Sequence, residues 1–370
     1  MMRQGFLLRA AGALLVVAHA SHLVTSPCGL FEGLYAPSTP RFATLIEYHW
    51  QLENASAITE SVTNAREHVE AWSQRNHECS AEKLYDLARV DLVVDAVRRC
   101  ACAFLAPQLA PQCKTVALDP AAGLVNVTRI FVGDSRMSGE ARVYAHMLRL
   151  HCGPALRLSR DYDGQARRTN FGAYCEELRS SVFFVRVETL NHTTALDVAA
   201  PVAQMKFEGA PVPALIETPT EVIFGVFVWN IIGLPGQDVA KFINGSVESA
   251  LAPFVRSVQN MLPSASLVLR ASPPVNPPMG GKIEGLLSKN LPLIRDTYDS
   301  WTTQERHFAA KIGIEYLDAS TLVHEYQVAL DIARGPRPLS ALYVDVWHPC
   351  VPLVPTTYVR LLPYMALARK

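Results

Sequence analysis

Short runs of consecutive hydrophobic residues alternate with longer stretches of helical periodicity after residue 128. Apolar runs of this kind, bounded by polar residues, are typical of buried parallel strands. They predict strands at residues 129–132, 182–187, 222–228, 266–270 and 314–317. Apolar positions at the helical period predict helices at residues 137–150, 239–262, 293–312, 319–332 and 355–368. Because strands and helices alternate, we expect an α/β fold, a three-layer sandwich with a mainly parallel sheet.

The beginning of the chain has the pattern of a secretory signal. Arg3 and Arg9 give a basic start, an apolar centre follows, and Ala18-His19-Ala20 forms a small-x-small cleavage site. We therefore expect residues 1–20 to be a signal peptide and the mature chain to begin near Ser21. The alternative is an uncleaved signal anchor, although the apolar centre is shorter than the about 20 residues that a membrane helix needs.

The next region, residues 21–115, is helical in pattern rather than alternating. Its apolar positions recur at the helical period over residues 60–72 and 81–104, and a proline-rich stretch ends the second helix. We expect a helical cap there, followed by a catalytic domain over residues 116–370. No later apolar run has the length of a membrane span, so no integral membrane domain is expected beyond the alternative N-terminal anchor.

The first predicted strand and the helix after it are joined by an abrupt turn, Gly133-Asp134-Ser135. Ser135 is therefore expected at the carboxyl end of a strand and the amino end of a helix. The turn lifts the hydroxyl out of the sheet, and the unpaired N–H groups of the helix start point at whatever the serine attacks. This position suits a nucleophile whose substrate develops a negative oxygen. The alternative is an ordinary turn in which Asp134 or Ser135 caps the helix.

A second polar motif lies near the end of the chain, where Asp345 and His348 are three positions apart. On a tight turn or one helical turn, such residues share a face. Asp345 can then accept a hydrogen bond from one imidazole nitrogen while the other nitrogen faces Ser135. We expect Ser135 to be the nucleophile, His348 the general base and Asp345 the residue that holds the imidazole tautomer. Surface salt bridges and metal sites use the same spacing and are the alternatives.

The motifs occur in a recognisable order: Gly133-Asp134-Ser135-Arg136, a strand end with Gly225 and Trp229, Ser-Pro-Pro-Val at residues 272–275, and Asp345 with His348. In this order they resemble the blocks of the SGNH (GDSL-like) hydrolase superfamily. The first block particularly resembles its PC-esterase branch. From about residue 129 onward, the chain resembles the luminal catalytic domain of sialic-acid O-acetyltransferases that carry a Cas1p-type membrane domain.

The resemblance implies a flavodoxin-like SGNH-hydrolase fold and a particular set of oxyanion donors. These donors are the Ser135 backbone N–H, a glycine of a second block and an asparagine of a third block. The Gly-x-Asn-Asp motif of the superfamily is absent, which leaves Asn230 as the candidate asparagine. The second-block glycine is ambiguous among Gly153, Gly164 and Gly172.

Other residues near these motifs are further candidates for the oxyanion or the substrate. Gly133 precedes the nucleophile turn, and Trp229 and Trp347 offer apolar faces to an acyl group or a sugar. A buried core position is the alternative for Trp229, and a polar strand end is the alternative for Asn230. Arg136 either holds an anionic group of the substrate or pairs with an acid in the core.

An acyl-enzyme on Ser135 has two fates. The resemblance favours transfer of an acetyl group to a carbohydrate or glycoconjugate, with an acetyl donor such as acetyl-CoA as co-substrate. Hydrolysis by water would make the protein a carbohydrate esterase with the same triad. A secreted glycan-binding protein that keeps the fold without turnover is the third reading. No bound cofactor or metal is expected.

Further features concern the compartment and the partners. All eight cysteines lie beyond residue 20, and an even count favours disulfides in a secreted chain. A zinc cluster is disfavoured because the one-residue spacing of Cys100 and Cys102 is not that of a zinc knuckle. The balanced charge, with 34 basic and 34 acidic residues, gives no argument for nucleic acid. Together with four sequons, these features predict a glycosylated protein of the secretory pathway, secreted or in the Golgi lumen; the sequons lie at Asn54, Asn126, Asn191 and Asn244.

Overall fold

The computed structural model describes residues 123–160, 170–190, 192–207, 220–225, 247–271 and 291–317, together with Val359 and Leu362. Its strands are β1 (Thr128–Gly133), β2 (Arg157–Leu158), β3 (Phe171–Cys175), β4 (Ser180–Arg186), β5 (Thr220–Gly225), β6 (Ser266–Arg270) and β7 (Glu315–Leu317). Its helices are α7 (Ser135–Cys152), the 3-10 turn η2 (Gly153–Ala155), α8 (Ala195–Gln204), α11 (Val247–Met261) and α13 (Leu291–Ile312).

The described strands form one sheet in the order β2-β3-β4-β1-β5-β6-β7. β1 pairs in parallel with β4 on one side and β5 on the other, and β5, β6 and β7 continue in parallel. β2 and β3 add an antiparallel edge beside β4. Numbered along the chain, the five parallel strands have the spatial order 2-1-3-4-5, which is the flavodoxin-like doubly wound order. The expected α/β fold with a mainly parallel sheet is therefore confirmed.

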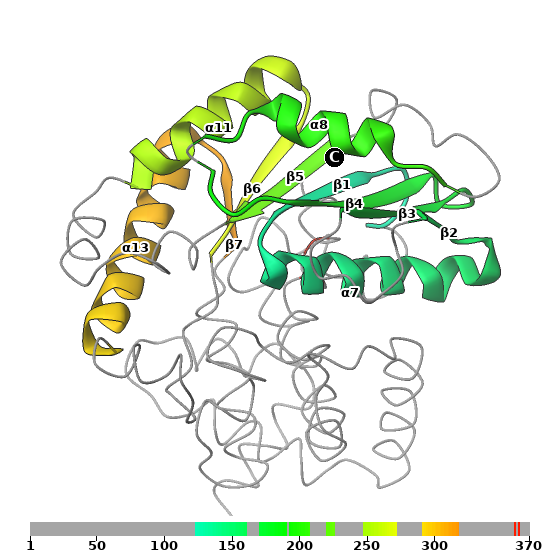
Figure 1. Ribbon diagram of the computed structural model, residues 1–370, viewed down its shortest axis with the longest axis horizontal. Helices are drawn as coiled ribbons and strands as arrows, with labels where there is room; N and C mark the ends of the chain where they lie inside the picture. Colours follow the sequence, from blue (N-terminus) through cyan, green and yellow to red (C-terminus); the bar gives the residue numbers. More distant parts are fainter. Residues whose placement is uncertain are drawn as a thin grey trace, which may run out of the picture.

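Helices cover both faces of the sheet (Figure 1). α8 and α11 lie on one face, α7 lies on the opposite face, and α13 packs against α11 and β7. The face under α8 and α11 is apolar because alternate strand residues point to it. These residues form one continuous core with the helices: Ile130, Val132, Phe183, Val185, Val222, Phe224, Leu267 and Leu269 from the strands, and Val198, Leu251, Phe254, Val258, Trp301 and Phe308 from the helices.

The opposite face is different because it buries charged residues beneath α7. Arg129, Glu221 and Arg270 lie on the strands, and each is at most 3% exposed. Burial of charges is costly unless each charge is paired, so the partners of these residues fix how α7 sits on the sheet. α7 is also tied at its far end by a disulfide between Cys152 and Cys175, the last residue of β3. This pairing is one of those that the even cysteine count allows.

The parallel strands follow the hydrophobic pattern closely. β1, β4, β6 and β7 match their predicted positions within one or two residues, and β5 begins two residues earlier than predicted. α7, α11 and α13 are also confirmed over their described residues. The sequence pattern did not predict β2, β3 or α8. The predicted cap over residues 21–115, the helix over residues 319–332 and most of the helix over residues 355–368 lie outside the described residues, although Val359 and Leu362 are helical.

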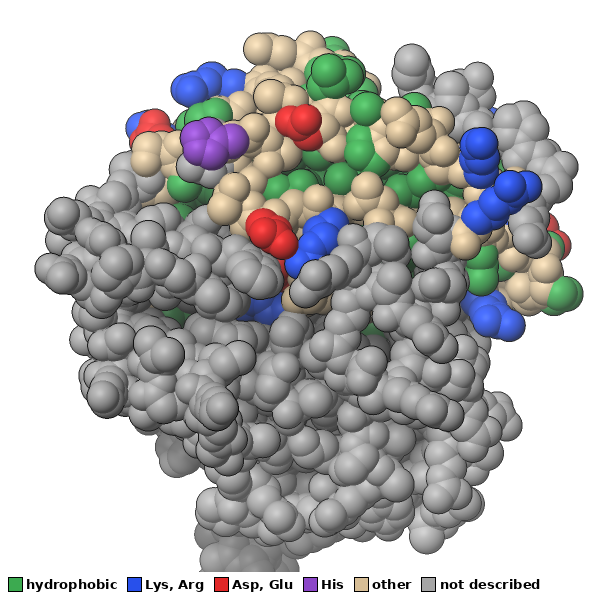
Figure 2. Space-filling view, viewed as in Figure 1, with side chains coloured by type: hydrophobic (Ala, Val, Ile, Leu, Met, Phe, Trp, Pro, Cys, Tyr) green, Lys and Arg blue, Asp and Glu red, His purple; other side chains and the backbone are tan. Residues whose placement is uncertain are grey.

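The surface of the described part is mixed. Figure 2 shows charged side chains of both signs scattered over one face of it, between hydrophobic and uncharged ones. Among the described helices, none combines the length and the apolar character that crossing a membrane requires.

Candidate active site

Ser135 lies where the sequence pattern places it, at the junction of β1 and α7. β1 ends at Gly133, and Asp134 has extended backbone angles before α7 begins at Ser135. The Asp134 carboxylate caps the helix by accepting from the Arg136 N–H at 3.0 Å. Ser135 is half-buried. The junction thus combines a half-buried serine with the N–H groups and positive dipole end of an 18-residue helix.

The position of this junction in the sheet is also informative. In a doubly wound sheet, ligands bind outside the carboxyl ends of the strands, at the point where the strand order reverses. Here the chain goes from β1 outward to β4 and then returns to the other side of β1 with β5, so the reversal lies between β1 and β5. Ser135 directly follows β1 and therefore lies at this switch point.

Two glycines bring the strand ends together at the switch point. Gly133 of β1 and Gly225 of β5 are paired in the parallel register. A Cβ on Gly133 would lie 2.8 Å from the Gly225 carbonyl oxygen, and a Cβ on Gly225 would lie 2.1 Å from the carbonyl oxygen of Arg270 on β6. Both distances are too short for real atoms, so only glycine allows the ends of β1, β5 and β6 to approach this closely. The glycines therefore set the position from which Ser135 projects.

Two buried ion pairs stabilise the same turn, one within the turn itself and one between α7 and β6. Arg136 Nη2 lies 3.3 Å from Asp134 Oδ2, with both side chains 3% exposed. One turn further along α7, Glu140 pairs with Arg270 at the end of β6. Burial alone would raise the pKa of Asp134, but the Arg136 guanidinium, the Arg136 N–H and the charge of Arg270 hold that pKa below its ordinary value. Asp134 therefore stays ionised as the helix cap.

This geometry distinguishes between the two readings of Arg136. Its side chain is buried and paired with Asp134, which agrees with the reading in which it pairs with an acid in the core. Arg136 thus helps to hold the Asp134-Ser135 turn rather than presenting its guanidinium at the surface. The alternative reading of Asp134 is correct as well, because Asp134 caps α7. A capping Asp134 and a nucleophilic Ser135 are compatible, since the cap uses the Asp134 carboxylate and not the Ser135 side chain.

Two of the candidate second-block glycines can be placed. Gly153 follows the last residue of α7, and since α7 has 18 residues it lies about 27 Å from the Ser135 end. Gly172 lies within β3, where its N–H donates to Ser159 Oγ at 2.9 Å. Neither residue is therefore arranged as an oxyanion donor for Ser135. Gly164 lies outside the described residues.

Several predicted site residues fall outside the described part of the chain: Asp345, His348, Trp229, Asn230 and Trp347. The structure thus places the Gly133-Asp134-Ser135 turn, and the catalytic roles of Ser135, Asp345 and His348 stay predictions. Sequence reasoning missed the buried partners Glu140 and Arg270. Their signal was a charged residue at the end of an otherwise apolar strand and another on the buried side of the helix.

The turn can support acyl-transfer chemistry. A hydroxyl at a helix start can attack a carbonyl carbon while nearby backbone N–H groups stabilise the oxygen that becomes negative. The glycines and the buried ion pairs fix the turn before any substrate arrives. Such preorganisation makes electrostatic stabilisation effective because no reorganisation is needed during the reaction.

Comparisons with known proteins complete the description. The sequence matches no protein-family model. A search of curated proteins found no match either. Among solved structures, a protein described as a GDSL-like lipase from Parabacteroides merdae has 11% identity and a TM-score of 0.38, over 65% of this chain and 97% of the lipase. An extracellular lipase from Streptomyces rimosus has 13% identity and a TM-score of 0.36, over 65% and 99%.

A third similar structure is that of an acetylxylan esterase from Geobacillus stearothermophilus, solved as a catalytic mutant. It has 14% identity and a TM-score of 0.29, over 66% of this chain and 92% of the esterase. The fold of the chain is established by its own strand order and register, which place Ser135 at the switch point of a flavodoxin-like sheet.

Proposed function

We propose that the protein catalyses O-acyl transfer through an acyl-enzyme on Ser135. The observation that carries the proposal is the place of Ser135, on a rigid strand-to-helix turn at the switch point of the sheet. This is where substrates bind in sheets of this order, and it is where helix-start donors can meet an oxyanion.

In the proposed mechanism, His348 takes the proton of Ser135 while the hydroxyl oxygen attacks the carbonyl carbon of an acyl donor. The tetrahedral intermediate places a negative charge on the former carbonyl oxygen, next to the N–H groups at the start of α7. His348 then gives the proton to the leaving group, and the acyl group stays on Ser135. Asp345 orients the imidazole and stabilises its charged form. The hydroxyl of a second nucleophile then gives its proton to His348 and attacks the acyl carbon. The ester bond to Ser135 breaks, and His348 returns the proton to the Ser135 oxygen.

We propose a sugar hydroxyl of a glycan as that second nucleophile and acetyl as the acyl group, with acetyl-CoA as one candidate donor. The support is the resemblance of the sequence blocks to sialic-acid O-acetyltransferases. Trp229 and Trp347 would offer faces for the pyranose ring. Hydrolysis is the alternative, because it needs nothing beyond water as the second nucleophile.

An acceptor experiment distinguishes transfer from hydrolysis. A transferase must hold the acceptor hydroxyl in place of water, so its acyl-enzyme turns over slowly until the acceptor is present. We expect an acetyl donor to be consumed slowly alone and faster when sialic acid or a related glycan is added. Mass spectrometry should show a sugar that gains one acetyl group. Rapid donor consumption that no sugar changes, with free acetate as the only product, would identify an esterase and leave the Ser135 chemistry in place.

We further propose that the protein works in the secretory pathway. The signal pattern, the sequons and the even number of cysteines support this location. In the sequon at Asn126, the residue Thr128 is 3% exposed and its hydroxyl bonds to that of Ser181 at 2.9 Å. A glycan on Asn126 must therefore be added before β1 pairs with β4. The sequons at Asn54, Asn191 and Asn244 lie outside the described residues.

Expression in a secretory host tests the compartment. We expect a chain that begins near Ser21, loses mass on glycosidase treatment, and contains a peptide with Cys152 joined to Cys175 before reduction. The mass of the intact protein before and after each treatment gives the result. A chain that retains Met1, carries no glycan and has eight free thiols would contradict the proposed compartment.

A further inference from the structure

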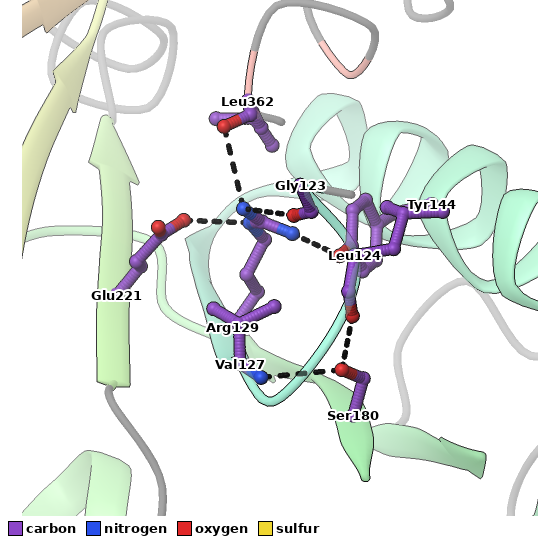
Figure 3. A network of polar contacts seen from close by, with 8 residues as sticks. All are labelled: Gly123, Leu124, Val127, Arg129, Tyr144, Ser180, Glu221 and Leu362. Atoms are coloured by element: carbon purple, nitrogen blue, oxygen red, sulfur yellow. Dashed lines mark hydrogen bonds and ion pairs between the residues drawn. The ribbon is translucent and has the colours of Figure 1, made fainter. Parts of the chain in front are cut away.

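Arg129, the second residue of β1, contacts four separate parts of the chain although its side chain is completely buried (Figure 3). Its Nε donates to Glu221 Oε2 on β5 at 2.6 Å, and Nη1 donates to the Tyr144 hydroxyl on α7. Nη2 donates to the carbonyl oxygens of Gly123 and Leu362, each at 3.3 Å. We call these five residues the Arg129 network.

The chemistry of the network requires arginine. A guanidinium carries five N–H donors in a fixed planar fork and can reach several acceptors at once, whereas a lysine ammonium is a compact point charge. Burial would lower the pKa of Arg129, but Glu221 and Tyr144 outweigh it and raise that pKa, so Arg129 stays charged. Burial raises the pKa of Tyr144 to about 12, so its hydroxyl stays protonated.

The contact with Leu362 connects β1 to the C-terminal part of the chain. Leu362 and Val359 are buried and helical, and they belong to the C-terminal part of the chain, after His348 in sequence. Arg129 lies on the strand that leads directly into Ser135. The guanidinium therefore joins the part of the chain that carries the nucleophile to the part that carries the predicted acid–base pair.

We propose that Arg129 is a positioning residue of the acyl-transfer site, an inference that rests on the proposed function. It anchors the segment around Leu362, which follows the predicted acid–base pair in sequence, to β1, the strand that leads into Ser135. Arg129 itself touches no substrate, because it lies four residues before Gly133, roughly 13 Å back along the strand. Its effect is on geometry, and a displacement of about 1 Å at a reacting group can lower a rate roughly a hundredfold.

The decisive variant is Arg129→Lys. It keeps a positive charge opposite Glu221 but cannot hold all four acceptors. We expect kcat for an acetyl ester to fall by about ten- to a hundredfold with KM changed less than about twofold, since Arg129 lies away from the end of β1 where the ester would bind, while the elements that it holds together shift. If the role of Arg129 were purely structural, the variant would have a lower melting temperature, but its kcat, measured at a temperature well below that melting temperature, would be unchanged. The matched control is Arg157→Lys, at the partly exposed ion pair with Glu176. This substitution should change neither kcat nor the melting temperature.

Hydrogen exchange supplies a readout that does not depend on activity. In the wild-type protein, amides around Leu362 should exchange as slowly as those of β1, and Arg129→Lys should speed exchange around Leu362 by about tenfold while α11 is unaffected. A folded Arg129→Lys protein with unchanged kcat and unchanged exchange would overturn the proposal. So would a wild-type protein in which residues around Leu362 exchange much faster than β1.

The role of Arg129 can still be tested if Arg129→Lys fails to fold or if the protein has no acyl-ester activity. If Arg129→Lys does not fold, Tyr144→Phe removes a single acceptor of the network and should lower kcat severalfold with KM unchanged; an unchanged kcat would again overturn the proposal. If the wild-type protein shows no acyl-ester chemistry at all, the proposed function fails. The hydrogen exchange of the two proteins then still decides whether Arg129 anchors the C-terminal part of the chain.

Discussion

Ser135→Ala is expected to abolish acyl-ester turnover and leave the fold intact. The substitution removes only the half-buried hydroxyl, while the Asp134 cap and the ion pairs beneath it remain. Loss of a serine nucleophile typically lowers kcat by roughly four to six orders of magnitude. The rate with an acetyl ester of a chromogenic alcohol, together with the melting temperature, measures both parts of the expectation.

Ser138→Ala is the matched control for this variant. Ser138 lies on the next turn of the same helix, where its Oγ accepts a hydrogen bond from Arg142 Nε at 3.5 Å. Its loss should leave the acyl-ester rate within about threefold of the wild-type rate, because a weak hydrogen bond away from the turn contributes only about 1 kcal/mol. A folded Ser135→Ala protein with full activity would show that Ser135 is not the nucleophile.

Gly225→Ala is expected to have the second large effect, on stability. The new Cβ would lie 2.1 Å from the carbonyl oxygen of Arg270, so β5 and β6 would have to separate at their carboxyl ends. Overpacking of a core commonly costs 1–3 kcal/mol, and here the clash is with backbone, so we expect a loss of at least about 3 kcal/mol. That is a large fraction of the roughly 5–15 kcal/mol by which domains are stable. Urea unfolding measures the change in the free energy of unfolding.

Gly172→Ala provides the comparison. A Cβ there would meet side-chain atoms of Phe183, Phe207 and Met205 at 2.8 to 3.1 Å, and side chains can move more easily than backbone. Its loss of stability should therefore be clearly smaller than that of Gly225→Ala. Equal stabilities of Gly225→Ala and the wild-type protein would mean that the strand ends are not held as closely as described.

The hydrophobic pattern predicted the central parallel strands β1, β4 and β5 because they are buried on both faces and contain continuous apolar runs. β3, which pairs with both β2 and β4, was missed because it has only five residues and Gly172 interrupts its apolar run. α8 was missed although its start carries a capping box between Thr194 and Asp197, because the helix is short and contains Pro201. A search for capping boxes would have found it.

The turn at Gly133-Asp134-Ser135 was predictable because a strand, a turn and a helix are adjacent in sequence. The buried charges were not, since their partners depend on how distant strands pair. Arg129 and Glu221 are register partners on β1 and β5, and Glu140 meets Arg270 across the sheet face. Each residue, read alone, looks like an ordinary polar strand end or a solvated helix position. The register of the parallel sheet brings Arg129 to Glu221, and the packing of α7 on the sheet brings Glu140 to Arg270.

The central claim is that Ser135 is an activated nucleophile. Incubation of the folded, purified protein with a fluorophosphonate, followed by peptide mass mapping, tests it most directly. The account predicts one label, on the peptide that contains Ser135, and a slower reaction when His348 is replaced by alanine. A folded protein that stays unlabelled, or that is labelled at another residue, would contradict the claim and favour a glycan-binding protein that keeps the fold without turnover.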